Sequence, residues 1–366
     1  MSLIKKFAAT TEAKPPVQPQ TTFKLKTAVQ IMQEAKNKPR PKRLFGDFWF
    51  EGELCFMFAS SNVGKTVLAV QIADAISRGT SIAPFQTEIA AQKVLYFDFE
   101  LTAIQFAGRY QAENDQTQFY SFSDDFLRPE ISMPKTKTEA EAQQVILADM
   151  ESCILESKAK IIIIDNLTRI AGDTTRADTA FAIMNLLDAL KKEKGLSILV
   201  LAHTPKRNQM QKITQNDLQG SSMIMNFADS CFSISKSGKD PDTRYIKQQK
   251  VRAVRMNYDE NNIITYCQNK DNCFLKFDFL GFEKETDQLQ ELDEADYSLR
   301  EETILFIYQS MQQPSLGKVA AQASKELGYI VHRQQISRII NKGKAKEQAV
   351  FLQQYNNNTS DDLPFD

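Results

Sequence analysis

The 366-residue sequence is short of histidine, of paired cysteines and of long apolar runs. Two histidines, His203 and His332, are too few for a histidine-rich metal centre. The five cysteines are scattered without a CxxC pair, which indicates reduced thiols and not a disulfide framework. The first residues carry lysines without an apolar segment behind them, and no run approaches the length of a membrane span. We therefore expect a cytoplasmic protein with no membrane contact.

The charge balance also excludes a strong overall preference for nucleic acid. Lysine and arginine number 45 and the acidic residues 46, so the formal net charge is -1. Any surface that attracts nucleic acid must therefore be local. With 42% hydrophobic residues and this length, the chain predicts one large globular domain with a smaller appendage.

Composition divides the chain into five segments. The lead-in is rich in Thr, Gln, Pro and Lys, and only its part at 26–36 has the spacing of a short helix. The segment predicted as a linker is acidic and almost free of branched aliphatics. The predicted boundaries are a flexible lead-in at 1–43, a large domain at 44–281, a linker at 282–298, a small helical domain at 299–345 and a disordered tail at 346–366.

The large domain alternates apolar strands with amphipathic helices, which predicts an α/β fold with a mainly parallel sheet covered on both faces. After Ala228 the strands shorten and are separated by turn residues, which predicts an antiparallel extension. The expected strands are 53–59, 93–100, 160–165 and 196–202, and the expected helices are 65–77, 102–113, 138–157 and 177–193.

The segment ASSNVGKT at 59–66 follows a buried strand and opens a helix, as a phosphate-binding loop requires. Lys65 would reach the β- and γ-phosphates, the Thr66 hydroxyl would bind Mg²⁺, and Gly64 would let the backbone approach. The first position is Ala59 where the motif has glycine, and the sequence alone does not say whether this weakens affinity. The nine candidate nucleotide-binding residues are Ala59, Ser60, Ser61, Asn62, Val63, Gly64, Lys65, Thr66 and Val67.

Acidic residues end the strands that follow this loop. The apolar strand 160–165 ends at Asp165, where a carboxylate can be presented to Mg²⁺, although an Asp that only begins a turn is the alternative. Asp98 and Glu100 lie at the end of the strand after the loop's helix and share one face, since residues i and i+2 point the same way. Either could act as a general base for the attacking water.

Together these motifs resemble the RecA-like P-loop ATPases, including the DnaB-type replicative helicases and the plasmid RepA helicases. The resemblance covers about residues 44–280, and the segment 217–234 is similar to the RepA group. It implies that Glu100 is the catalytic base and that His203 is the sensor of the γ-phosphate; a satisfied surface histidine is the alternative. Lys250 and Arg252 match the pair that reaches the neighbouring subunit's nucleotide, although an exposed basic edge strand remains open. The resemblance thus implies a homo-oligomer, a ring or filament, with a hexamer as the expected form.

Two basic loops would contact single-stranded DNA by its phosphates. One, at 168–179, carries Arg169 and Arg176; the other, at 203–216, carries Lys206, Arg207 and Lys212. Neither has an aromatic residue for base stacking, so solvated loop charge is an open alternative.

The C-terminal helices resemble a helix-turn-helix or winged-helix module, with Gly317 and Gly328 near the turns. Such a module would contact duplex DNA, whereas an oligomerisation or protein-docking domain is the alternative. Its last helix carries the polar residues His332, Arg333, Gln334, Gln335, Arg338 and Lys342.

The sequence therefore predicts an ATP- and Mg²⁺-dependent RecA-like motor that acts on DNA, with a RepA-type replicative helicase of a mobile element or plasmid as the expected kind. The alternatives are an ATP-gated DNA-binding or regulatory switch with slow hydrolysis, and a scaffold that binds ATP structurally. The polarity of movement, the DNA sequence and partner proteins are not accessible from the sequence.

Overall fold

The computed structural model describes most of the chain. The described residues are 24–132, 134–166, 177–218, 221–289, 292 and 294–344. Most of the predicted lead-in and the predicted tail at 346–366 lie outside them. Within the described part of the lead-in, the helix expected at 26–36 is confirmed as α2 (Ala28–Lys36), whose start is closed by a capping box on Thr27.

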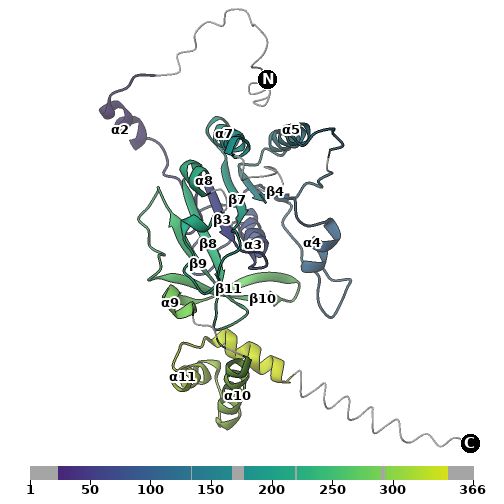
Figure 1. Ribbon diagram of the computed structural model, residues 1–366, viewed down its shortest axis with the longest axis vertical. Helices are drawn as coiled ribbons and strands as arrows, with labels where there is room; N and C mark the ends of the chain where they lie inside the picture. Colours follow the sequence, from purple (N-terminus) through teal and green to yellow (C-terminus); the bar gives the residue numbers. More distant parts are fainter. Residues whose placement is uncertain are drawn as a thin grey trace, which may run out of the picture.

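One nine-stranded sheet organises the described residues, with the strand order β11-β10-β9-β8-β3-β7-β6-β4-β5 (Figure 1). The pairings from β8 through β3, β7, β6 and β4 to β5 are parallel, whereas β8, β9, β10 and β11 pair antiparallel. The predicted parallel sheet with an antiparallel extension is confirmed. The strands are β3 (Leu54–Ala59), β4 (Val94–Asp98), β5 (Phe126–Leu127), β6 (Ile161–Asp165), β7 (Ser197–His203), β8 (Ser230–Lys236), β9 (Thr243–Lys250), β10 (Ile263–Asp271) and β11 (Phe274–Glu283), with a separate ladder of β1 (Arg43–Phe45) and β2 (Trp49–Phe50).

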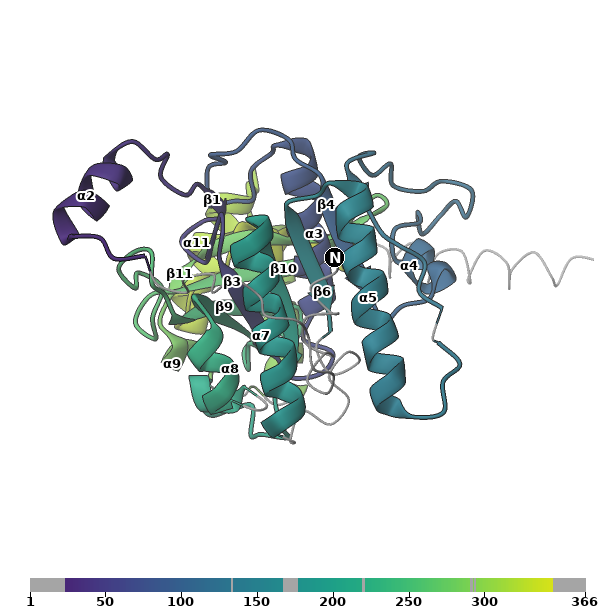
Figure 2. The same cartoon turned by 90° about the horizontal axis from the view of Figure 1, so that it is seen from above.

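The helices cover both faces of the sheet, because alternate side chains of each central strand point to opposite sides. In β3, Leu54, Phe56 and Phe58 belong to one apolar core, while Cys55, Met57 and Ala59 belong to the other. The first core is closed by α5 and α7, which lie near each other in Figures 1 and 2, and by α8; the second is closed by α3 and the β1–β2 ladder. The helices of this domain are α3 (Lys65–Arg78), α4 (Ala103–Arg109), α5 (Glu139–Ser157), α7 (Ala177–Lys194), α8 (Ser221–Phe227) and α9 (Glu285–Gln288).

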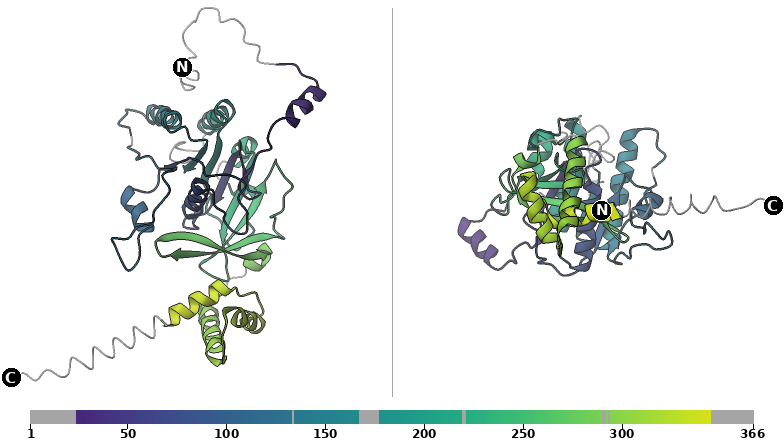
Figure 3. Two further views of the ribbon diagram at one scale, coloured as in Figure 1. Left: turned by 180° about the vertical axis from the view of Figure 1, so that it is seen from behind. Right: turned by 90° about the horizontal axis from the view of Figure 1, so that it is seen from below.

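Three helical segments beyond the sheet share a small core of their own, below the antiparallel strands in Figure 3. They are α10 (Glu294–Ser310), α11 (Leu316–Leu327) and the helical residues 333–344. Ile304, Val319 and Ile336 contribute one fully buried side chain from each segment. Among the described helices, none combines the length and the apolar character needed to cross a bilayer.

The predicted linker at 282–298 contains more regular structure than its composition indicated. It holds the end of β11, all of α9 and the start of α10. Acidic Glu285 is fully buried, because its carboxylate accepts bonds from Lys247, from the Tyr245 hydroxyl and from the Ile213 amide. An acidic residue satisfied in this way does not signal a solvated linker.

Candidate nucleotide-binding site

The phosphate-loop segment leaves the end of β3 and enters α3, as its motif predicts. Gly64 has a φ of 106°, a left-handed conformation that favours glycine. A Cβ at this position would lie 2.7 Å from Phe277 Cζ, so the close approach of β11 requires glycine as well. Arg244 of β9 fixes the loop, because its guanidinium donates to the Val63 carbonyl oxygen at 2.8 Å.

Ala59 occupies the last position of β3 and is fully buried in the core beneath the loop. Its side chain faces away from the pocket that Ser61, Asn62, Gly64, Lys65, Thr66 and Val67 line. Ala59, Ser60 and Val63 are therefore not among the pocket's lining residues. The departure from glycine lies in the support of the loop and not in its open face.

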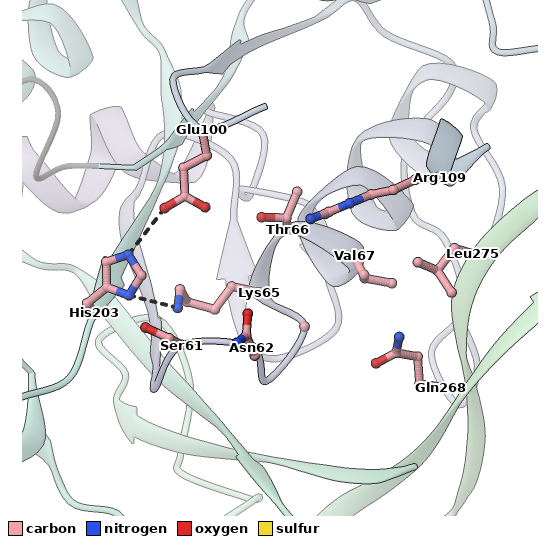
Figure 4. Close-up of a pocket in the computed structure, with 11 residues that line it drawn as sticks. Ser61, Asn62, Lys65, Thr66, Val67, Glu100, Arg109, His203, Gln268 and Leu275 are labelled. Atoms are coloured by element: carbon pink, nitrogen blue, oxygen red, sulfur yellow. Dashed lines mark hydrogen bonds and ion pairs between the residues drawn. The ribbon is translucent and has the colours of Figure 1, made fainter. Parts of the chain in front are cut away.

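Lys65 begins α3 and turns its side chain back across the loop. Its ammonium donates to the carbonyl oxygens of Ala59 (3.0 Å) and Ser60 (3.2 Å) and lies 3.2 Å from His203 Nδ1. Burial lowers the pKa of Lys65, against the opposing attraction of Asp165 and Glu100. The lysine charge is thus held at the floor of the pocket (Figure 4).

Thr66 and Asp165 meet at the other side of the loop. The Thr66 hydroxyl donates to Asp165 Oδ2 at 2.7 Å, and the Tyr96 hydroxyl donates to the same oxygen at 2.9 Å. Asp165 Oδ1 is buried and has no hydrogen-bond partner among the described residues. Burial raises the pKa of Asp165 to about 6, so its charge would be stabilised by a cation. A hydroxyl beside a buried carboxylate with an unused oxygen is a donor set that suits Mg²⁺.

The two acidic residues at the end of β4 have different roles in the structure. Asp98 is buried: its Oδ1 accepts from the backbone amides of Glu100 and Leu101, and its Oδ2 pairs with Arg128 at 3.1 Å. Glu100 lies across the pocket from Thr66, with its side chain one-third exposed. Asp98 therefore shapes the turn, and only Glu100 is open to a nucleotide.

His203, at the end of β7, connects Lys65 with Glu100. Its Nδ1 faces the Lys65 ammonium, which can only donate, so Nδ1 accepts and Nε2 carries the proton. Nε2 then donates to Glu100 Oε1 at 3.2 Å. This bond, together with the neighbouring charge of Lys65, lowers the pKa of Glu100 below its ordinary value. Glu100 is thus held ionised, the state that a general base requires.

The structure adds residues that sequence reasoning missed. Asn166, directly after β6, is buried, and its Nδ2 donates to Glu100 Oε1. Arg109 from α4, Gln268 from β10 and Leu275 from β11 complete the lining of a pocket of about 440 Å³. The position of Asn166 directly after Asp165 was a signal in the sequence; the other three are brought in by tertiary packing alone.

Strand β10 lines two cavities. Gln268 faces the nucleotide pocket, while its neighbours Cys267 and Asn269 face a second pocket of about 430 Å³ against the C-terminal helices. The alternation of a strand accounts for this arrangement, because successive side chains point to opposite faces.

Lys250 and Arg252 lie apart from the nucleotide pocket of their own chain. Lys250 pairs in register with Cys231 near the start of β8, whereas the phosphate loop follows the end of the parallel strand β3. Its ammonium donates to the Met225 carbonyl oxygen, and burial lowers its pKa. The half-exposed Arg252 pairs with Asp229 at 2.8 Å.

The basic loops are only partly described. The loop at 168–179, with Arg169 and Arg176, lies outside the residues whose side chains the structure describes. In the loop at 203–216, Arg207 is bonded to Asp217 and to two loop carbonyl oxygens, so it holds the loop and is not free for phosphate. Lys206 is exposed, and Lys212 pairs with Glu260 at 3.3 Å.

Four of the six polar residues predicted for the last helix contact the large domain. Gln335 is buried and donates to Asp240 at 2.8 Å, and Arg338 pairs with the same carboxylate at 3.2 Å, as does Arg300 of α10 at 3.1 Å. His332 lies 3.0 Å from Glu283. Gln334 donates to the Phe279 carbonyl oxygen, and Lys342 pairs with Glu301 of α10. Arg333 is exposed and forms no hydrogen bond or ion pair with the other described residues.

A phosphate loop at the end of a central strand and strand-terminal carboxylates beside it define a P-loop ATPase fold. The sequence comparison then gives the family. The chain belongs to the AAA_25 family, described as an AAA domain, whose model matches residues 19–209, just over half of the chain.

Similar structures include a KaiC-like protein of the hyperthermophilic archaeon Pyrococcus horikoshii OT3. The two are 12% identical in sequence, the TM-score is 0.45, and the match covers 65% of this chain and 99% of that one. No curated protein matches the chain.

Proposed function

We propose that the protein is a DNA-dependent motor that hydrolyses ATP, of the kind represented by the RepA-type replicative helicases of mobile elements and plasmids. The observation that carries the proposal is the chain of contacts from Lys65 through His203 to Glu100. It connects a phosphate-binding group with a candidate base through the residue from which the loop at 203–216 begins. The cytoplasmic location expected from the sequence is part of the proposal.

The donor set fits Mg²⁺ and ATP. Thr66 and Asp165 would hold the metal ion, since Asp165 keeps a buried oxygen without a partner among the described residues. Bound Mg²⁺ would supply charge neutralisation at the phosphates. The backbone of the loop and the first turn of α3 would bind the phosphates, and Lys65 would exchange its carbonyl partners for phosphate oxygens.

Glu100 would accept the proton of the attacking water, because its side chain reaches the pocket and its lowered pKa keeps the carboxylate ionised. His203 would couple the γ-phosphate to the following loop, where Lys206 is an exposed cation. Contact of that loop with DNA phosphates would be independent of sequence.

Assembly of several copies is part of this proposal. Lys250 and Arg252 lie away from the pocket of their own chain, as residues that complete a neighbour's site would. A second observation supports assembly: α2 stands away from the sheet in Figures 1 and 2, with Val29 65%, Ile31 53% and Met32 63% exposed. A nine-residue helix with an exposed apolar face is marginal without a partner. A hexameric ring is the expected form.

The test is steady-state ATP hydrolysis with Mg²⁺, with and without single-stranded DNA, for the natural protein and for Lys65→Ala. Stimulation by DNA that disappears in the variant would support the motor and justify a strand-separation assay. Turnover that DNA does not change would oppose it.

One observation favours the second candidate, an ATP-gated DNA-binding switch. Four of the six side chains expected to contact duplex DNA are instead bonded to the large domain, so their contact with DNA would require helix 333–344 to leave it. Slow turnover together with ATP-dependent binding of duplex DNA would distinguish this switch from the motor.

A further inference from the structure

We propose that Asn166 is a positioning residue for the catalytic base, a role that rests on the proposed function of Glu100. Asn166 is buried at the end of β6, next to Asp165, and its carboxamide lies between Glu100 and His203. It has no ionisable group, so it contributes through hydrogen bonds alone.

The bonding roles of the three side chains follow from Lys65. Because Lys65 only donates, His203 Nδ1 accepts and Nε2–H donates to Glu100 Oε1. Asn166 Nδ2 lies 2.9 Å from His203 Nε2, but two donors do not bond to each other, so its hydrogen bond goes to Glu100 Oε1. The opposite amide orientation would place Asn166 Oδ1 against an ionised carboxylate oxygen and is excluded on charge.

Two donors thus converge on one oxygen of Glu100. Among the described residues, none donates to the second oxygen, Oε2, and Figure 4 shows the Glu100 carboxylate between His203 and Thr66 in the view. Occupying Oε1 selects Oε2 as the oxygen that meets water. A base held by one donor would rotate about its last side-chain bond, whereas two donors from different strands fix its plane.

Single-turnover hydrolysis of ATP and binding of a fluorescent ATP analogue test the inference with Asn166→Ala, Asn166→Asp and Asn257→Ala. Asn257 is the matched control, because its Nδ2 donates to the Asp47 carboxylate at 2.8 Å away from the pocket. We expect both Asn166 variants to lose roughly 10- to 100-fold in hydrolysis rate while retaining nucleotide affinity. Asn166→Asp keeps the side chain's size, so it decides the matter where Asn166→Ala does not fold.

A double variant tests whether Asn166 affects the hydrolysis rate through Glu100. If Asn166 acts through Glu100, Asn166→Ala should cost little further rate in a Glu100→Gln background. An undiminished loss in that background, a parallel loss of nucleotide affinity, or natural rates in both single variants would overturn the inference. A fully active Glu100→Gln would instead overturn the proposed base itself, so the two failures are distinguishable.

Discussion

Charged side chains lie together in two regions of the molecule, the nucleotide pocket and the contact between the C-terminal helices and the large domain. In the first region they line a cavity, whereas in the second they pair with one another. Lys65, Glu100 and Arg109 line a cavity. Asp240, with 2% of its side chain exposed, is instead enclosed by Arg300, Arg338 and Gln335. The same residue types thus serve a binding site in one region and a domain contact in the other, and their packing decides which.

The two carboxylates at the end of β4 test most directly the difference between a side chain that lines the pocket and one that is paired and buried. Glu100→Gln should lower ATP turnover by about 10²- to 10⁴-fold while nucleotide affinity is kept, because an amide cannot accept the proton. Asp98→Asn should act mainly on stability, since the buried Asp98 carboxylate is the counterion of the partly buried Arg128. Turnover, nucleotide binding and urea unfolding of both variants check this. Equal loss of turnover with equal stability would contradict the assignment.

The buried carboxylate of Asp240 tests the contact between the C-terminal helices and the large domain. Burial alone would raise its pKa, but Arg300 and Arg338 hold it below the ordinary value. Its contribution to stability is therefore present at neutral pH and is lost as the pH falls through that lowered pKa. Asp240→Asn should reduce the free energy of unfolding by about 3 kcal/mol, because the buried Arg300 loses its counterion and Arg338 loses one of its two.

Asp242→Asn is the control for Asp240, since its side chain is 51% exposed and forms its one ion pair within the described part of the chain with Arg338, at 2.8 Å. We expect a change below about 1 kcal/mol. Urea unfolding at neutral pH measures both variants, and similar losses would show that the buried network does not hold the helices.

The two histidines offer a smaller test based on pH. His203 is the first cause of the lowered pKa of Glu100, so His203→Ala should raise that pKa and move the acid limb of the pH–turnover profile to higher pH. His332→Ala removes a contact with Glu283 outside the pocket and should leave the limb where it is. Each profile is compared with its own maximum, and coincident acid limbs in both variants would count against the Glu100 assignment.

Ala59→Gly should have the smallest effect. The buried methyl group supports the end of β3 and does not line the pocket, so restoring the motif's glycine should leave nucleotide affinity unchanged. Stability should fall by about 1 kcal/mol through backbone freedom and lost packing. Binding of a fluorescent ATP analogue and thermal unfolding measure the two effects; a gain in affinity would show that Ala59 disturbs the loop.

The sequence predicted best what depends on the chain's own local pattern. The loop from β3 to α3 and the strand ending at Asp165 follow from hydrophobic runs and motif spacing, and a parallel sheet brings such strand ends together. The residues alone left Asp98 and Glu100 as equal candidates, and only the family resemblance favoured Glu100, because the turn and the contact with Arg128 that separate their roles are tertiary features. Arg109 and Gln268 come from elements whose approach to the pocket no local pattern encodes.

The C-terminal helices show what the sequence could not predict. Their existence was predictable from apolar spacing, and a compact helical core is present. Two of the residues expected to contact DNA, Gln335 and Arg338, lie against the large domain, because its buried carboxylate Asp240 binds them. A helix's polar face shows that it can make hydrogen bonds but does not identify the partner.

Gln268 lines the nucleotide pocket, and its neighbours Cys267 and Asn269 line the C-terminal pocket. The backbone of β10 at these residues is therefore a wall that the two pockets share. Arg338 donates to Cys267 Sγ at 2.9 Å, so the terminal helix rests directly on the reverse side of this wall. Any displacement of β10 that enlarges the first pocket takes space from the second. The volume available to a nucleotide and the seating of the last helix are therefore not independent quantities in this molecule.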